Sequence, residues 1–427
     1  MEEQKSGALN VQEVEALRHQ FPILSRSGRS GDPIAYLDSS ATAQKPQCVI
    51  DAETQFYEHT NAAVNRGTHL LGDESTQAFE DARETVAAFV GARPDELVWT
   101  KNATEALNLV AYAFSNATAE DLNGPFKLGP GDRVVTTRSE HHANLIPWQE
   151  LCRKTGAEFA YLDLDEQGRI DLATLDVITK NTKVVAFTHV SNVTGAISPV
   201  KQIVEAARAV GALVVLDTTQ SSAHMPIDVQ QLGVDFACFS SHKMCGPTGV
   251  GALWGRADLL EQMPPVLTGG SMIATVTMER AIYQDPPARF EAGSQPVAQA
   301  VGWARAVKFL REVGMDRIAA YEDQITAQLL EGVRSVDGVR ILGPQDPNGR
   351  IGVVSFALDG VHPHDVGQFL DGASVAVRVG HHCAIPLHTF FGVRSSTRAS
   401  ASLTTTPAEV DRLVRALRGV REFFVGG

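Results

Sequence analysis

Short, continuous apolar runs alternate with amphipathic stretches through the middle of the chain. Each run predicts a strand buried on both faces, because such a strand has no side that faces water. These strands are expected at residues 133–137, 158–162, 183–188, 213–216, 236–239 and 250–254. The stretches between them predict helices at 145–154, 172–178 and 200–210. Strands that alternate with helices are typical of a mostly parallel sheet with helices on both faces.

Both ends of the chain predict further elements. On the N-terminal side we expect helices at 11–20, 76–90 and 106–114, and strands at 34–38 and 97–100. A loop-rich stretch at 259–295 ends the central region. Beyond it the pattern predicts helices at 297–313, 316–333, from 364 and at 407–424, with strands at 339–341, 352–356 and 375–377. We therefore predict an α/β protein with a large domain (30–295) and a smaller α/β domain made of 1–29 and 296–427.

The composition is that of an ordinary globular protein. With 427 residues, of which 44% are hydrophobic, the chain suffices for two or three domains, or for one large domain with an appendage. Its net charge of −13 argues against nucleic acid and anionic membranes as partners, since both are negatively charged themselves. The polar start of the chain does not predict a signal peptide, and no apolar run of about 18 residues predicts a membrane span.

The cysteines are few and scattered. They form no CxxC pair and no repeated spacing, and their number is odd: Cys48, Cys152, Cys238, Cys245 and Cys383. This usage predicts reduced thiols and a cytoplasmic location rather than a disulfide framework. We expect no metal site.

A lysine follows the predicted strand 236–239 and precedes a Gly/Pro loop. An ammonium group is costly to bury, so burial would lower the pKa of Lys243. The free amine can then form a Schiff base with an aldehyde. A surface lysine ahead of a turn is the alternative interpretation.

A carboxylate ends the strand before it. Because the carboxyl ends of parallel strands meet at one edge of a sheet, Asp217 and Lys243 are expected to face one crevice. A lysine for the Schiff base and a carboxylate that holds a pyridine nitrogen protonated suit pyridoxal phosphate (PLP). The alternatives for Asp217 are a helix cap and a solvated strand end.

Other polar residues that follow strands suit the remaining parts of this cofactor. Thr104 opens a helix, where free N–H groups and the helix dipole favour an anion, although it is alternatively an N-cap. Ser240 and His242 flank Lys243 and are expected to reach the same phosphate. The ring would be contacted by three further residues: His141 by stacking, and Asn192 and Gln220 by hydrogen bonds.

The last third of the chain contains a candidate nucleophile. Cys383 lies in a Gly/Pro loop with Arg378 and two histidines, surroundings that favour the reactive thiolate. A buried, inert thiol is the alternative. Arg398 is expected to bind a substrate carboxylate through its planar fork.

These motifs together resemble the class V aminotransferase family of fold type I PLP enzymes, in particular the cysteine desulfurases and selenocysteine lyases of the SufS and Csd type. The resemblance runs from residue 37 to the last helix. It is carried by Glu140-His-His-Ala-Asn144 with Pro147-Trp-Gln149, Ser191-Asn-Val193, Ser240-Ser-His-Lys243 with Gly246-Pro247, and Arg378-x-Gly-His-His-Cys383.

The resemblance implies a fold and a set of roles. The fold would be that of fold type I, with a mostly parallel seven-stranded sheet in the large domain. Lys243 would bond PLP and shuttle protons, and Cys383 would attack the sulfur of L-cysteine, giving L-alanine and a persulfide. The other PLP contacts would be Asp217, Gln220, His141, Asn192, Ala103, Thr104, Ser240 and His242, with Ser294 reaching a phosphate across a dimer interface. The substrate contacts would be Arg398, Asn192, Arg378 and Asn65.

The resemblance also implies a biological setting. It predicts a homodimer in sulfur metabolism and iron–sulfur cluster assembly, with an acceptor protein or a thiol taking up the sulfur. Several positions depart from the family pattern and are expected to line the active site: Asn65 in place of His, Thr218-Thr219, Ser241 and Thr404-Thr405-Thr406. They leave a second interpretation open, a PLP-dependent C–S or C–Se lyase that acts on another cysteine-like substrate in a specialised pathway.

Overall fold

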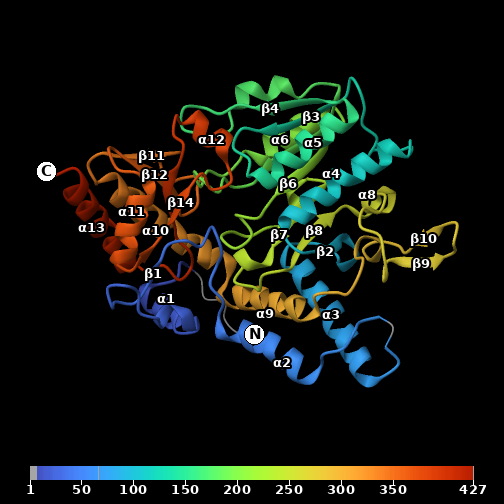
Figure 1. The fold of residues 1–427 in the computed structure, drawn as a ribbon, viewed down its shortest axis with the longest axis horizontal. Helices are drawn as coiled ribbons and strands as arrows, with labels where there is room; N and C mark the ends of the chain where they lie inside the picture. The colour runs from blue at the N-terminus through green and yellow to red at the C-terminus, as the bar shows by residue number, and fades with distance from the viewer. Residues whose placement is uncertain (1–6, 66, 427) are drawn as a thin grey trace.

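The computed structural model describes residues 7–65 and 67–426. A seven-stranded sheet forms the centre of the molecule, in the order β2-β8-β7-β6-β5-β3-β4 (Figure 1). Its strands are β2 (Leu97–Thr100), β3 (Arg133–Thr137), β4 (Glu158–Leu162), β5 (Thr182–Thr188), β6 (Leu213–Asp217), β7 (Phe236–Ser240) and β8 (Gly251–Gly255). The predicted mostly parallel sheet is confirmed.

Only β8 runs against the other strands, pairing antiparallel with both β2 and β7. The connection from β7 to β8 explains this direction. It consists of the segment 241–250, whereas a return to a parallel strand needs a crossover of about a dozen residues or more, usually with a helix. The segment that carries Lys243 is therefore a tight turn at one end of the sheet.

Alternate residues of the strands contact different helix layers. Val134, Val184 and Val215 pack with α4 (Ala103–Ala119) and α5 (Ile146–Thr155). Val135, Val185 and Val214 belong to the larger core on the other face. That face is covered by α2 (Gln47–His59), α3 (Leu70–Phe89), α6 (Val200–Ala209) and α9 (Val297–Val313). We call this sheet and its helices the large lobe.

The C-terminal part of the chain forms a second unit, which we call the small lobe. Its antiparallel sheet has the order β11-β12-β15-β14. The strands are β11 (Val339–Leu342), β12 (Val353–Leu358), β14 (Arg378–Gly380) and β15 (Ser396–Ser400), and the helices are α10 (Met315–Arg334), α11 (Pro363–Gly372), α12 (Ile385–Phe390) and α13 (Pro407–Phe424). The N-terminal segment contributes α1 (Val11–Arg18) and β1 (Ala35–Tyr36), which pairs with β13 (Val375–Ala376). The predicted domain limits stay a prediction.

Several elements differ from those expected. Helix α2 was not predicted, because only Val49 and Phe56 of it are buried and its apolar pattern is weak. Helix α3 begins at Leu70 rather than residue 76, and 172–177 is a 3₁₀ helix. The stretch expected to be loops contains α8 (Ala257–Gln262) and a hairpin of β9 (Ile273–Val276) and β10 (Ala281–Tyr283); the short α7 (Val229–Leu232) was also missed.

Strand β15 was missed for a different reason. Its sequence, Ser396-Thr-Arg-Ala-Ser400, is mostly polar, yet all five residues are buried between β12 and β14. A mostly polar sequence has no apolar pattern from which a buried strand could be predicted. Within the described residues, no helix has an apolar stretch long enough to cross a membrane.

A buried ion pair ties the loop before α9 to the large lobe. Arg83 on α3 donates to both oxygens of Glu291, at 2.6 and 2.9 Å, and the backbone N–H of Trp99 donates to the same carboxylate at 2.7 Å. All three residues are buried. Removing one partner of such a pair leaves a charge without compensation.

We expect Arg83→Met to lower the free energy of unfolding by about 3–5 kcal/mol, because Glu291 stays buried without its cation. Urea denaturation measures this change. The control is Glu80→Gln, which removes the exposed carboxylate that contacts the same arginine and should change stability by less than about 1 kcal/mol. An equal loss of unfolding free energy in the two variants would contradict the stabilising role of the Arg83–Glu291 pair.

Candidate active site

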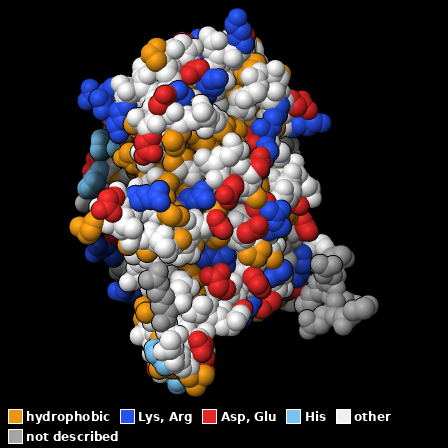
Figure 2. All heavy atoms as spheres, turned by 90° about the vertical axis from the view of Figure 1, so that its right-hand side faces the viewer, with side chains coloured by type: hydrophobic (Ala, Val, Ile, Leu, Met, Phe, Trp, Pro, Cys, Tyr) orange, Lys and Arg blue, Asp and Glu red, His pale blue; other side chains and the backbone are white. Residues whose placement is uncertain are grey.

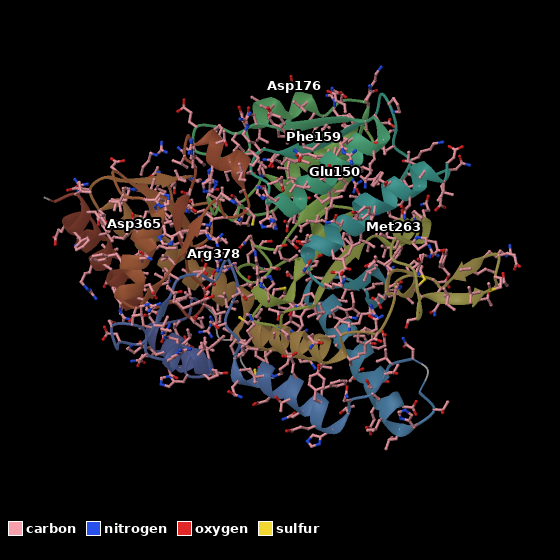
Figure 3. All side chains as sticks on the ribbon, viewed as in Figure 1. Glu150, Phe159, Asp176, Met263, Asp365 and Arg378 are labelled. Carbon is pink, nitrogen blue, oxygen red and sulfur yellow. The ribbon has the colours of Figure 1, made fainter. Side chains whose placement is uncertain are left out.

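A cavity of about 300 Å³ opens where the carboxyl ends of the central strands meet the small lobe. It brings together most of the predicted site residues. The large lobe contributes Ala103, Thr104, His141, Asn192, Asp217, Gln220, Ser240, His242 and Lys243, and the small lobe contributes Arg378, Cys383 and Arg398. Figure 3 places Arg378 between the two lobes. Residues from widely separated parts of the chain therefore share one cavity.

Lys243 ends a 3₁₀ turn directly after β7 and faces this cavity. Removal of its amine from water lowers the pKa of Lys243 to about 8, and the positive charge of Arg398 adds to the effect. The carboxylate of Asp217 acts in the opposite direction but does not cancel it. The lysine therefore holds a much larger share of free amine near neutral pH than a lysine in water.

Asp217 lies at the end of β6, level with Thr188 on β5 and Cys238 on β7. Its Oδ1 accepts the backbone N–H of Thr219 at 2.9 Å and the thiol of Cys238 at 3.4 Å. Neither contact caps a helix, so the cap interpretation of Asp217 is wrong. The carboxylate is 5% exposed, which argues equally against a solvated strand end.

The start of α4 lies against the cavity. Asn102 is the N-cap, since its side chain accepts the N–H of Glu105 at 2.9 Å, and the alternative of Thr104 as the cap is wrong. Ala103 and Thr104 are instead the first two helical residues, whose N–H groups have no partner within a helix. A side chain at Gly251 would come within 2.7 Å of the Cα of Asn102, so glycine there permits this close approach.

His141 is presented by a loop that a chain of buried hydrogen bonds holds in place. Glu140 accepts from Asn144 at 2.6 Å and from the N–H of Thr188 at 3.0 Å, and Trp148 donates to Asn144 at 3.0 Å. Burial raises the pKa of Glu140 to about 8, against the effect of its donors. Glu140, Asn144 and Trp148 therefore fix the loop, and His141 is the residue that the loop presents to the cavity.

The ring of His141 is neutral and its tautomer is fixed. Burial lowers the pKa of His141 to about 4, and the positive charge of Lys243 contributes. Nδ1 accepts the N–H of Ala143 at 3.0 Å, so the proton is on Nε2. A neutral imidazole at the cavity wall can stack on a flat ring without adding charge.

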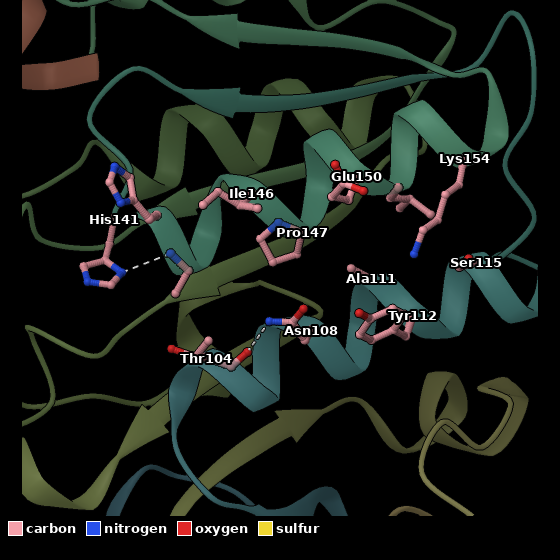
Figure 4. Close-up of a pocket in the computed structure, with 13 residues that line it drawn as sticks. Thr104, Asn108, Ala111, Tyr112, Ser115, His141, Ile146, Pro147, Glu150 and Lys154 are labelled. Atoms are coloured by element: carbon pink, nitrogen blue, oxygen red, sulfur yellow. Dashed lines mark hydrogen bonds between the residues drawn. The ribbon is translucent and has the colours of Figure 1, made fainter. Parts of the chain in front are cut away.

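A groove of about 410 Å³ adjoins the cavity on the outside, between α4 and α5. Figure 4 shows His141 and Thr104 at one end and Lys154 and Ser115 at the other. His141 and Thr104 line both spaces, so the groove is continuous with the outer edge of the site.

Cys383 differs from the other cysteines. It is exposed, whereas Cys152, Cys238 and Cys245 are buried and Cys48 is half-buried. Burial raises the pKa of all four of the others, so their thiols stay protonated. Of the five thiols, all of which the structure describes, Cys383 is thus the one placed to react in the cavity. None of them forms a disulfide.

Arg378 and Arg398 both contact the carboxylate of Asp38, a residue that was not predicted from the sequence. Nε and Nη2 of Arg378 contact the carboxylate of Asp38 at 2.7–3.1 Å, and Nη2 of Arg398 lies 3.5 Å from it. Nη1 of Arg398 donates to the carbonyl oxygen of Asn192 at 2.9 Å. A charged residue at a strand end before the small residues Ser39-Ser40-Ala41 was the available signal for Asp38.

Several buried polar atoms of the cavity wall have no partner: Ser40 Oγ, Gln220 Oε1, His382 Nδ1 and Arg398 Nε. Buried polar groups without partners are rare in folded proteins. Gln220 Oε1 is an acceptor and Arg398 Nε is a donor, whereas the Ser40 hydroxyl and the His382 ring nitrogen can take either role. Combined with an amine, a carboxylate and a helix start, these atoms match a polar ligand with an anionic group. The donor set fits PLP with an amino-acid substrate.

Most of the departures from the family pattern do not line the cavity, contrary to expectation. Thr406 caps α13, Thr405 accepts from Tyr321, and Thr218 donates to Cys238. Ser241 is the buried first residue of the turn that carries Lys243. Among these positions only Thr219 faces the cavity, because the others are used by caps, turns and packing.

Two predicted site residues lie outside the cavity. Asn65 is on the exposed loop before α3, with a φ of 75°, and its N–H donates to Thr76. Ser294 is exposed in the turn before α9. Their roles stay predictions.

Comparison with known proteins agrees with this geometry. Residues 35–413 match the family described as "Aminotransferase class-V". The chain belongs to this family. It is 51% identical to the "Probable cysteine desulfurase 2" of Mycobacterium leprae, covering 98% of this chain and 99% of that one. It is 43% identical to the "Cysteine desulfurase" of Haloferax volcanii, covering 96% and 98%.

Solved structures lead to the same family. An apo cysteine desulfurase from Thermococcus onnurineus superposes with a TM-score of 0.90 at 34% identity, covering 99% of this chain and 100% of that one. The cysteine desulfurase CsdA of Escherichia coli, in an S-sulfonic acid form, superposes with a TM-score of 0.87 at 34% identity, covering 97% of this chain and 100% of that one. The resemblance and the fold type I class inferred from the sequence are confirmed.

The amine of Lys243 should titrate with a midpoint near pH 8 in the protein without cofactor. Competitive acetylation with mass spectrometry measures this, because only the neutral amine reacts. Arg398→Met should raise the midpoint, since it removes a positive charge that disfavours the ammonium form. Arg394→Met, which removes an exposed arginine of the same lobe, is the control and should leave the midpoint unchanged. A midpoint near 10.4, the value of a lysine in water, would contradict the assignment.

Proposed function

We propose that the protein is a PLP-dependent cysteine desulfurase, which converts L-cysteine to L-alanine and leaves the sulfur on Cys383 as a persulfide. The observation that carries the proposal is the shared cavity of Lys243, Asp217 and the one exposed thiol. The names of the relatives support it. The acceptor of the sulfur would be a protein or a small thiol, in a cytoplasmic setting and with iron–sulfur cluster assembly as one destination.

PLP would be held by residues of the large lobe. Lys243 would bond to it covalently, and Asp217, whose Oδ1 already accepts two donors, would offer Oδ2 to the ring N–H. His141 would stack on the ring, with Gln220 and Asn192 at its oxygen. The phosphate would be bound by Ala103, Thr104, Ser240 and His242. When bound, PLP supplies an aldehyde that reacts with amines and a ring that delocalises negative charge.

The substrate carboxylate would be bound by Arg398, whose Nε is buried and has no partner in the protein. Asp38 holds the guanidinium groups of Arg378 and Arg398 side by side before substrate arrives. Asn192, which contacts Arg398 through its carbonyl oxygen, would assist. The geometry favours an amino acid with one carboxylate, because Asp38 already occupies part of the donor set.

The transfer of sulfur requires a base and a nucleophile. Lys243 Nζ would take the Cα proton of the substrate, a task that its lowered pKa suits. The Cys383 thiolate would then attack the substrate sulfur: an S–S bond forms, the C–S bond breaks, and its electron pair stays with the substrate carbon, which takes a proton. Cysteine and one thiol thus become alanine and one persulfide, and no external oxidant or reductant is needed.

A lyase for another cysteine-like substrate or for selenocysteine is the second candidate. The positions that differ from the family pattern would support it, but of these only Thr219 faces the cavity. Incubation of the PLP-loaded protein with cysteine and selenocysteine, followed by identification of the products and of any adduct on Cys383, distinguishes the two. Turnover of neither amino acid would refute the proposed function.

Cys383→Ala should abolish persulfide formation while the protein keeps its yellow cofactor colour and its bleaching by borohydride. We expect sulfide and alanine release from cysteine to fall by about 100-fold or more, the order seen when a nucleophile is removed. The control is Cys48→Ala, since Cys48 is half-buried outside the cavity, and its turnover should match wild type. Unchanged turnover in Cys383→Ala would mean that another group attacks the sulfur.

We further propose that the protein is a homodimer in which Asn65 and Ser294 reach the cavity of the second copy. Both lie outside the cavity of their own chain. The hairpin β9–β10 projects from the same side of the large lobe, where hydrophobic side chains are exposed among charged ones (Figures 1 and 2). Met278 at its tip is 98% exposed and Leu70 beside the Asn65 loop is 69% exposed. Covering these apolar side chains would add to the stability of such a dimer.

Light scattering should therefore give the mass of a dimer. Met278→Asp should weaken the dimer, because it places a charge where a hydrophobic side chain is to be covered. Phe423→Asp is the control: Phe423 is 72% exposed on α13, at the opposite end of the molecule, and its replacement should not affect association. A monomeric wild type would refute the dimer.

A further inference from the structure

The loop that carries Cys383 has an uncommon backbone conformation. His382 and Cys383 have φ angles of 50° and 55°, and two successive residues with side chains rarely adopt the left-handed region. Such a conformation persists only where the surroundings impose it. The contacts that impose it decide where the thiol points.

His142, on the large lobe, makes two of these contacts. Its backbone N–H donates to the carbonyl oxygen of Cys383 at 2.7 Å. Its ring nitrogen Nε2 accepts the N–H of Ile385 at 3.1 Å. Both bonds lie just after the thiol along the chain, one at the carbonyl oxygen of Cys383 and one at the first residue of α12. Asn192 adds a third contact through Nδ2, which donates to the carbonyl oxygen of His382 at 2.7 Å.

The ring contact depends on the state of the imidazole. Nε2 can accept an N–H only when it carries no proton, so His142 is neutral with its proton on Nδ1. Partial burial lowers the pKa of His142, and the ring of His381, with its centroid 5.6 Å away, adds to this effect. Because the ring is only partly buried, at the end of the groove between α4 and α5, its replacement leaves no void in the core.

We propose that His142 is a positioning residue: its ring acceptor, by binding the N–H of Ile385, holds the Cys383 loop over the cavity. His142 touches neither the lysine nor the arginines of the site. It acts through the loop that it fixes. The importance of this loop for catalysis rests on the proposed function, whereas the fixing of the loop does not.

Hydrogen–deuterium exchange tests the fixing directly, in the protein with and without PLP. The variants are His142→Gln, whose side-chain oxygen lies close to the place of Nε2 and still accepts, and His142→Leu, which has similar size and no acceptor. We expect the 381–386 segment to exchange about fivefold faster or more in His142→Leu, the effect of losing one hydrogen bond, and at the wild-type rate in His142→Gln. Helix α6 serves as the internal control and should exchange alike in all forms.

His142→Ala is a second variant without an acceptor and should behave like His142→Leu. The test therefore stays valid even if one of the two variants fails to fold. Wild-type exchange in both non-accepting variants would overturn the proposal. Fast exchange in His142→Gln as well would also overturn it, because ring shape rather than the acceptor would then hold the loop.

Turnover gives the second readout. With L-cysteine as substrate, kcat in His142→Leu should fall by about 10- to 100-fold, since a displaced nucleophile reacts poorly, while KM and the cofactor spectrum stay unchanged. His142→Gln should recover most of kcat. An unchanged kcat in His142→Leu despite a loosened loop would overturn the positioning role. If the wild type does not release sulfur from cysteine at all, the proposed function fails, and the exchange experiment still decides whether His142 fixes the loop.

Discussion

The exclusion of water from the amine of Lys243, beside the guanidinium of Arg398, is the constraint on which the site depends. It lowers the pKa of the lysine to about 8, so that a primary amine serves as nucleophile and base near neutral pH. Neither group creates this environment alone. Lys243 lies on the turn after β7 of the large lobe, and Arg398 lies in β15 of the small lobe. The contribution of Arg398 therefore requires the two lobes to be docked.

Polar contacts hold the lobes in this arrangement, and many of them involve the segment after β5. The carbonyl oxygen of Asn192 accepts from Arg398, and its side chain donates to His382. Ser355 on β12 donates to the carbonyl oxygen of Val193 at 2.6 Å. A side chain at Gly195 would come within 2.8 Å of two carbonyl oxygens of the small lobe, so glycine there permits close packing. The contacts that join the lobes are thus the contacts that shape the cavity.

Few charged side chains of the site lack a compensating partner, because its histidines are neutral and its two arginines share Asp38. Burial lowers the pKa of His141 and of His242 to about 4, so both rings are neutral at physiological pH and leave the positive charge to lysine and arginine. Asp38 lies against both arginines and limits their mutual repulsion. The neutral imidazole of His142 serves as an acceptor for the backbone of the cysteine loop. Histidine here supplies shape and hydrogen bonding rather than charge.

Much of the large lobe could be predicted from the sequence, because its strands are continuous apolar runs and its helices are amphipathic. The polar residues that end these strands could be assigned to one edge of the sheet for the same reason, and Lys243 and Asp217 are found there. The small lobe was predicted less completely. Strand β15 is buried although it is polar, since its neighbours β12 and β14 satisfy its backbone. Its side chains are covered partly by the large lobe, as at Arg398, and partly by the small lobe itself, as at Ser396 and Thr397.

The sequence by itself determined the parallel sheet, a lysine and a carboxylate at the same edge of that sheet, and the cysteine between basic residues, because periodicity and residue type are local properties of the chain. Only the tertiary structure decided that Asp38 joins the two arginines, that His142 holds the cysteine loop, and that most departures from the family pattern lie outside the cavity. Each of these depends on hydrogen bonds and charges between segments far apart in sequence, such as Asp38 and Arg378. No local pattern encodes such pairs, since they form only when packing brings the two segments together.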